Sequence, residues 1–378
     1  MTSPMPTDLL LLTPPMTQLN TPYPGTAYLA RYLRGQNYEV AQGDLGIELI
    51  HRLFSKSSLN EIFDMLIEDE DELSDASQRI LQLRDQYANT IEAVIAFLQG
   101  KRQTLAHRIA SRKYLPEGPR FSVIAQMPKD TFGEMALHDR AKLYATLYLE
   151  DFSFFIQEAV SPHFEFTRYA EKISTFLPEL TPMIELIDNG PDMIGEDILA
   201  LLEEKITLTQ PTMIGFSVPF PGNLYAAFLC ADHIKKHHPD IKVLLGGGFP
   251  NTELRELSDA RIFDYFDYIC LDDGEVPLDR ILRLNKGENV KLCRTFTLVD
   301  GKVHYSGETP GGQLSHELCG WPDYKGLDMD LYLNTFDVAN PMNRLWSDGR
   351  WNKLTIAHGC CWKKCTFCDV NLDFIGRY

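Results

Sequence analysis

Three cysteines near the end of the sequence have the types and spacing best suited to chemistry. Cys361, Cys365 and Cys368 follow the pattern Cys-x3-Cys-x2-Cys. Thiolates bind soft metals and iron–sulfur clusters, and a group this dense has no ordinary reason to lie in an apolar core. Structural zinc sites commonly use four protein ligands. A four-iron cluster held by only three thiolates would keep an open coordination position on its fourth iron.

Two other interpretations of these cysteines stay open. The thiols could be buried or adventitious, or they could form a zinc site completed by His358 or Asp369. Cys360 is a further cysteine beside them, but its use in place of Cys361 would change the spacing to Cys-x4-Cys-x2-Cys. We therefore assign Cys361 as a ligand and Cys360 as a bystander.

The cysteine spacing resembles the motif of the radical S-adenosylmethionine (radical SAM) enzymes, and Phe367 is the aromatic residue usual before the last cysteine of that motif. The resemblance implies that Cys361, Cys365 and Cys368 hold a [4Fe–4S] cluster whose fourth iron binds S-adenosylmethionine, with Phe367 near the adenine. It also implies one-electron cleavage of S-adenosylmethionine to a 5'-deoxyadenosyl radical. A reducing partner such as flavodoxin or ferredoxin would supply the electron.

The elements that must position these residues follow an α/β pattern. The apolar run 354–357 predicts a short strand directly before the cysteines, so that the cluster loop would leave a strand at its carboxyl end. Five further apolar runs alternate with helical or helix-containing segments, which predicts a parallel sheet. These runs are Leu9–Leu12, Tyr38–Ala41, Met213–Val218, Val243–Leu245 and Tyr268–Leu271.

Glycine-rich or turn-forming loops follow these strands. Pro14 and Ser217 lie where the first and third strands end, Gly246, Gly247 and Gly248 follow the fourth, and Gly274 and Glu275 follow the fifth. Loops that leave parallel strands meet at one edge of the sheet, where ligands of such sheets bind. Three glycines there would let the backbone approach a bulky ligand. The sequence has neither a Walker loop nor a Gly-x-Gly-x-x-Gly fingerprint at this place.

Five such strands, with Gly-Gly-Gly after the fourth and Asp-Gly-Glu after the fifth, resemble the cobalamin (B12)-binding domain that precedes the barrel in a large subclass of radical SAM enzymes. No Asp-x-His-x-x-Gly motif occurs, so no histidine is nominated as a lower cobalt ligand. The resemblance implies cobalamin-dependent methyl transfer to an unactivated carbon of a small-molecule or peptide substrate. The cobalamin contacts that it implies are Pro14, Ser217, Gly246, Gly247, Gly248, Gly274 and Glu275.

The implied domains are a Rossmann- or flavodoxin-like B12-binding domain at 1–46 and 206–290, a helical insertion at 47–205, a bridging segment at 291–345, and the start of a TIM-like radical SAM barrel at 346–378. A full barrel takes about 250 residues. We therefore expect the N-terminal part of a longer enzyme, inactive by itself. Two alternatives remain, a radical SAM enzyme whose N-terminal domain binds no cobalamin and a non-catalytic zinc- or iron–sulfur-binding module.

Shorter sequence patterns predict individual helices, a hairpin and exposed charged segments. Apolar residues at steps of three and four predict helical faces at 80–98 and 144–159 within the insertion. An Asp-Gly turn between 295–299 and 302–305 predicts a hairpin. The basic end of a helix at 235–238, which includes His237 and His238, suits the helix dipole, so we interpret the histidines as a cap and not as a metal site. The acidic run 68–72 is typical of a solvated face.

Composition narrows the class of protein. The chain has 378 residues, of which 44% are hydrophobic and 24% charged, as in ordinary globular proteins. A net charge of −17 argues against nucleic acid or an anionic membrane as a partner. Eight cysteines, with no signal peptide pattern and no spanning apolar stretch, favour the cytoplasm. The isolated cysteines are interpreted as small buried hydrophobes: Cys230, Cys270, Cys293 and Cys319.

Overall fold

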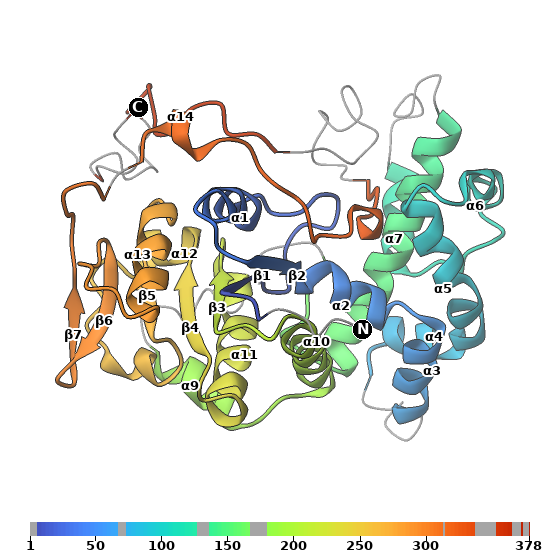
Figure 1. Cartoon of the computed structure of the whole chain (residues 1–378). Coiled ribbons are helices and arrows are strands. Elements are labelled where there is room, and N and C mark those ends of the chain that lie inside the picture. The colour runs from blue at the N-terminus through green and yellow to red at the C-terminus, as the bar shows by residue number, and fades with distance from the viewer. Residues whose placement is uncertain are drawn as a thin grey trace.

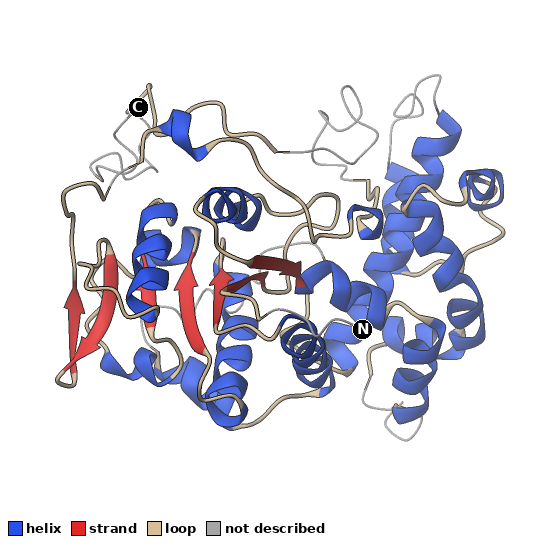
Figure 2. Ribbon diagram, viewed as in Figure 1, coloured by secondary structure: helices blue, strands red, loops and turns tan. Residues whose placement is uncertain are grey.

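In the computed structural model a seven-stranded sheet carries helices on both faces, and further helices form a bundle beside it (Figures 1 and 2). The sheet has the order β2-β1-β3-β4-β5-β6-β7. The structure describes residues 6–66, 73–126, 136–166, 180–312, 314–336, 353–364, 372 and 378.

The first five strands of the sheet are parallel, and β6 and β7 add an antiparallel hairpin at one edge. The order of the parallel strands, 2-1-3-4-5, is that of doubly wound sheets of the flavodoxin type. The prediction of a mostly parallel α/β sheet is confirmed, with the five predicted strands and the hairpin present. The strands are β1 (Leu9–Thr13), β2 (Val40–Asp44), β3 (Met213–Ser217), β4 (Lys242–Gly246), β5 (Tyr268–Cys270), β6 (Thr295–Val299) and β7 (Lys302–Tyr305).

The central strands β1 and β3 are buried on both faces along their whole length, which explains why they are mostly apolar rather than alternating. Leu9 and Leu11 of β1 pack in one cluster with residues of α1 (Gly25–Gly35) and α13 (Glu275–Asn285). Leu10 and Leu12 face the opposite way and share a cluster with residues of α10 (Met193–Thr209) and α11 (Leu224–His237). The alternation of side chains along a strand therefore divides the core into two layers.

The described residues between β2 and β3 form helices, short 3-10 turns and loops. The two predicted helical faces are buried, one along α4 and α5 and the other along α7. The helices here are α2 (Leu45–Leu53), α3 (Lys56–Met65), α4 (Asp75–Gln82), α5 (Arg84–Leu98), α6 (Ala106–Ala110), α7 (Ala136–Ala159), α9 (Thr181–Asp188) and α10, and the acidic run 68–72 lies outside the described residues. The expected boundaries of the insertion fall inside α2 and α10.

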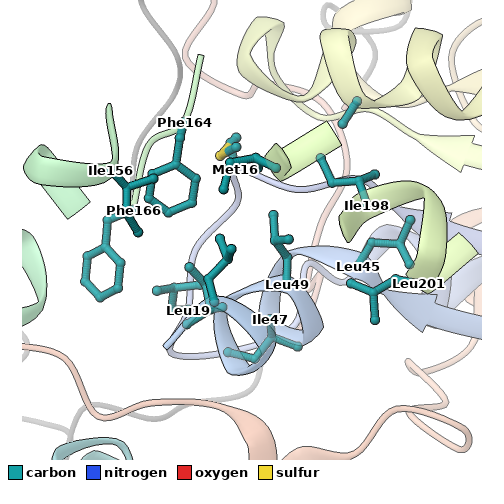
Figure 3. Packing of buried hydrophobic residues seen from close by; sticks show 14 of the residues in the cluster. Met16, Leu19, Leu45, Ile47, Leu49, Ile156, Phe164, Phe166, Ile198 and Leu201 are labelled. Atoms are coloured by element: carbon teal, nitrogen blue, oxygen red, sulfur yellow. The ribbon is translucent and has the colours of Figure 1, made fainter. Parts of the chain in front are cut away.

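One continuous core joins the bundle to the sheet. Figure 3 shows Leu45, Ile47 and Leu49, all of α2, lying between two groups of apolar side chains. On one side are Ile198 and Leu201 of α10, and on the other are Ile156, Phe164 and Phe166 from α7 and the loop after it. The helix α2 therefore belongs to both the bundle and the layer that covers the sheet.

Asp44 is a buried carboxyl at this junction. It is 3% exposed and caps α2 by accepting hydrogen bonds from the backbone N–H groups of Gly46 (3.0 Å) and Ile47 (3.3 Å). The Tyr332 hydroxyl donates a third hydrogen bond of 2.8 Å. Burial outweighs these bonds and raises the pKa of Asp44 from 3.8 to about 6.

We expect this carboxyl to make stability depend on pH. Between about pH 4 and pH 6 the folded state holds a proton that the unfolded state has lost, so the free energy of unfolding falls as pH rises through that window. The change corresponds to about 3 kcal/mol. Urea unfolding should show a smaller fall in Asp44→Asn than in wild type, because Asp151, whose pKa burial also raises to about 6, still titrates in the variant. Asp300→Asn, in the exposed turn before β7, should keep the wild-type slope, and an unaltered slope in Asp44→Asn would contradict the assignment.

Candidate functional site

A cavity of about 1050 Å³ lies at the carboxyl edge of the parallel strands. The cavity is lined by Leu11 of β1, Phe216 of β3 and Leu244 of β4, and by residues of the loops after β4 and β5. In the sheet, β2 lies on one side of β1 and β3 lies on the other, so the strand order reverses at β1. Ligands of open α/β sheets usually bind at the carboxyl edge beside such a reversal. The volume is at the upper end of the range for small-molecule and cofactor pockets.

The cavity brings together most of the residues predicted from the loops. Ser217, Gly246, Gly247, Gly248, Gly274 and Glu275 all line it. Pro14 is buried after β1 and is not among the lining residues. Its carbonyl, like that of Pro15, accepts a hydrogen bond from the Asn223 side-chain amide, at 3.2 and 2.6 Å respectively. Pro14 therefore joins the loop after β1 to the start of α11.

The absence of a side chain has a different structural consequence at Gly246 than at Gly247 and Gly248. A Cβ atom on Gly247 would lie 2.6 Å from the Val218 carbonyl oxygen, and one on Gly248 would lie 2.5 Å from that of Pro219. These two glycines let the loop after β4 approach the loop after β3. A Cβ on Gly246 would meet nothing nearer than Cys270, at 3.9 Å. Gly246 is thus the glycine whose missing side chain leaves room beside the cavity.

The loop after β5 supplies acidic groups to the cavity. Asp272 is paired with Arg255, and the buried Arg294 donates to the backbone carbonyl of Asp273 at 2.9 Å. Glu275 is 8% exposed, and burial raises its pKa, with a smaller contribution from the Asp273 carboxylate. Neither lysine nor arginine is among the described residues that line the cavity. The lining therefore offers hydrogen-bond acceptors and disfavours phosphate.

The segment that leads to the predicted cluster loop passes along this cavity. Thr355, Ile356, Ala357 and His358 line it, and His358 Nε2 lies 3.5 Å from the Asp273 carboxylate. Figure 1 shows this C-terminal part of the chain above the carboxyl edge of the sheet, near α14 (His316–Cys319). The loops after β4 and β5 and the segment before the cysteines, far apart in sequence, thus border one cavity.

The prediction of a strand at 354–357 is wrong for this structure. The segment has no strand partner among the described residues; the Thr355 N–H donates to the Tyr28 hydroxyl at 2.8 Å, and the Tyr324 hydroxyl donates to the Lys353 carbonyl at 3.3 Å. Ile356 is 89% exposed. An apolar run becomes a strand only where another backbone completes its hydrogen bonds, and the bonding neighbours here are side chains.

Only part of the cysteine motif belongs to the described residues. Cys361 is exposed, and the neighbouring Cys360 accepts a hydrogen bond from the Lys363 N–H, at 3.4 Å, that lowers the pKa of its thiol. Cys365, Phe367 and Cys368 lie outside the described residues, as does Asp369. The cluster geometry accordingly stays a prediction.

Tyr28 and Cys319 are among the cavity residues that were not identified as site residues in the sequence. Tyr28 comes from α1, and Cys319 comes from α14 in the expected bridging segment. Burial, and then the carboxyl groups of Glu275 and Asp273, raise the pKa of the Cys319 thiol to about 12. Cys230, Cys270 and Cys293 are buried as expected. Cys319 differs because it is partly exposed at the cavity, and no spacing in the sequence indicates this.

Comparisons with models of protein families, with functionally curated proteins and with solved structures find no match for this chain. The fold and the cavity by themselves define the class, a mostly parallel α/β protein with a cofactor-sized cavity at the carboxyl edge of its sheet. Among the helices of the described ranges, none is both long enough and apolar enough to cross a bilayer.

Proposed function

We propose that the cavity binds cobalamin and that the chain is the cofactor-binding part of a radical SAM enzyme. In this proposal Cys361, Cys365 and Cys368 hold a [4Fe–4S] cluster that binds S-adenosylmethionine. One observation carries the proposal: the loops predicted to contact cobalamin and the segment that leads to the predicted cluster border the same cavity. A methyl transfer that needs both cofactors requires such proximity.

The residues of the cavity fit a large, amide-rimmed cofactor. The cavity volume of about 1050 Å³ exceeds what most small metabolites fill. Leucine and phenylalanine side chains of the strands offer apolar contact to a macrocycle, while Asp273, Glu275 and Ser217 offer oxygen acceptors to amide N–H donors around its rim. Gly246 leaves the space that a side chain would otherwise occupy. The exposed Cys361 is accessible for cluster assembly.

The proposed roles of the chain's own residues follow from their positions. When bound, the cofactors would supply one-electron chemistry and a transferable methyl group. Ser217 and Glu275 would orient cobalamin through its amide groups. Tyr28 and Ile356 would limit the entry of water from the side where the C-terminal segment passes. The three cysteines would hold the cluster, and the cavity's acidic groups would favour a ligand that donates hydrogen bonds over a phosphate-rich one.

A substitution at Gly246 tests the proposal. We expect the wild-type chain, mixed with hydroxocobalamin and separated from free corrin by gel filtration, to retain about one equivalent by its visible absorbance. Gly246→Leu should weaken retention at least tenfold, because the new side chain would enter the cavity. Gly35→Leu is the matched control, since a Cβ at the exposed end of α1 has nothing within 4 Å.

Two results would remove the support for cobalamin. The first is that the wild-type chain retains no corrin at micromolar concentration. The second is that Gly246→Leu retains as much as wild type and Gly35→Leu. If iron–sulfur reconstitution succeeded alongside either result, a radical SAM enzyme with an N-terminal domain that binds no cobalamin would become the better description.

A further inference from the structure

Three side chains of metal-ligating types lie close together at the opposite edge of the sheet from the cavity. Glu203 of α10, His233 of α11 and His238 at the end of α11 each bring a ligand atom within 4.8 Å of the others. The Nε2 atoms of His233 and His238 lie 2.6 and 2.8 Å from the same oxygen of Glu203. The helix α11 ends just before β4 begins, so this group lies at the amino edge, away from the cofactor loops.

The end of α11 makes this convergence possible. Two residues five positions apart point about 140° away from each other around an ideal helix. His238, however, has left the helix, with φ −132° and ψ 57°, while its N–H still bonds the Ile234 carbonyl at 2.7 Å. Its imidazole can therefore turn towards the same side as that of His233. The packing of α10 beside α11 brings Glu203 to meet them.

The donor set matches a recognised kind of metal centre. Two imidazole nitrogens and one carboxylate oxygen form the three-protein-ligand set of many zinc sites, in which water takes the fourth position. Around a tetrahedral zinc, ligand atoms lie about 3.3 Å apart. The observed separations of 2.6 and 2.8 Å are shorter, so each histidine nitrogen needs to move away from the Glu203 oxygen by roughly 0.5–0.7 Å, and the ligand atoms of the two histidines already lie within 4.8 Å of each other. The ring of His237 lies 4.4 Å from that of His233 and is exposed, which makes it an alternative to water.

The surroundings permit an ion to enter. The side chains of His233, His238 and Glu203 are 19%, 29% and 38% exposed, so an ion can reach them without unfolding. Nearby Asp232 is already paired with Lys236, at 2.7 Å. We propose that Glu203, His233 and His238 bind a zinc ion that fastens α10 to α11. His238 lies at the end of α11, as the cap interpretation expects, and its imidazole also contacts the Glu203 carboxylate from another helix.

The test uses the full chain with Cys360, Cys361, Cys365 and Cys368 replaced by serine, so that this group of thiolates cannot compete for the metal. Co²⁺, which reports tetrahedral coordination through its visible absorption, is added to metal-stripped protein and then displaced by Zn²⁺. We expect one ion per chain, a tetrahedral spectrum and no thiolate charge-transfer band. His233→Gln and His238→Gln should each weaken Zn²⁺ binding at least tenfold. His107→Gln, an exposed histidine of α6, is the matched control.

Glu203→Gln keeps the test informative should a histidine variant fold poorly. Its amide oxygen still accepts hydrogen bonds from both imidazoles, so the metal-free melting temperature should stay near that of the parent while zinc affinity falls. The proposal is overturned if the parent binds no zinc at micromolar concentration. It is also overturned if the double variant His233→Gln/His238→Gln binds zinc as tightly as the parent. Because these residues do not line the cavity, neither result depends on cobalamin binding.

Discussion

Replacing Cys361 by alanine should abolish the [4Fe–4S] cluster, while replacing Cys360 should leave it intact. Loss of a thiolate ligand removes one of the three protein bonds to the cluster, whereas Cys360 falls outside the Cys-x3-Cys-x2-Cys spacing. The two residues are adjacent and both are accessible, so they form a matched pair. The measurement is anaerobic reconstitution with iron and sulfide, followed by iron analysis and electron paramagnetic resonance of the reduced chain.

Other outcomes of this measurement would point to a different ligand set, a different metal or a closed iron position. A signal that survives in Cys361→Ala and disappears in Cys360→Ala would move the ligand assignment to Cys360. Zinc bound in place of iron, lost in the variant Cys361→Ala, would favour the non-catalytic binding module. A change in the spectrum on addition of S-adenosylmethionine would support an open iron position, and its absence from an intact cluster would count against that part of the proposal.

Gly247→Ala should lower the free energy of unfolding by about 3 kcal/mol, because it combines backbone strain with overpacking. Gly247 has φ +107°, a conformation that alanine rarely adopts. The added Cβ would also lie 2.6 Å from the carbonyl oxygen and 2.8 Å from the nitrogen of Val218. Those backbone atoms cannot move away cheaply, since the Val218 N–H bonds the Gly246 carbonyl and the Val218 carbonyl accepts from the Phe249 N–H.

Gly301→Ala is the control that separates the two contributions. Gly301, in the hairpin turn, has φ +71°, but a Cβ added there would have nothing within 4 Å, so alanine meets strain without a clash. Its cost should be about 1 kcal/mol. Urea unfolding monitored by circular dichroism gives both values. Equal losses in the two variants would show that the approach of the loops after β3 and β4 contributes nothing to stability.

The sequence by itself determined the sheet and the edge at which a ligand would bind. The runs at 9–12 and 213–218 are continuous and apolar because both faces of a parallel sheet are buried, so local composition identifies them. Glycine and acidic residues directly after strands converge for a purely topological reason, since parallel strands end at one edge. This is why Ser217, Gly246 and Glu275 meet at the cavity as expected.

Only the tertiary structure decided the features that depend on partners from distant parts of the chain. The apolar run 354–357 has no strand partner among the described residues and is no strand, although its composition favours one. Gly247 lets the loop after β4 approach the backbone of Val218 closely, which no local pattern indicates. His233 and His238 meet Glu203 because α10 packs beside α11 and because α11 ends at His237. The sequence gives the chemical types of these side chains. Whether they meet depends on how the helices pack and on where each helix ends.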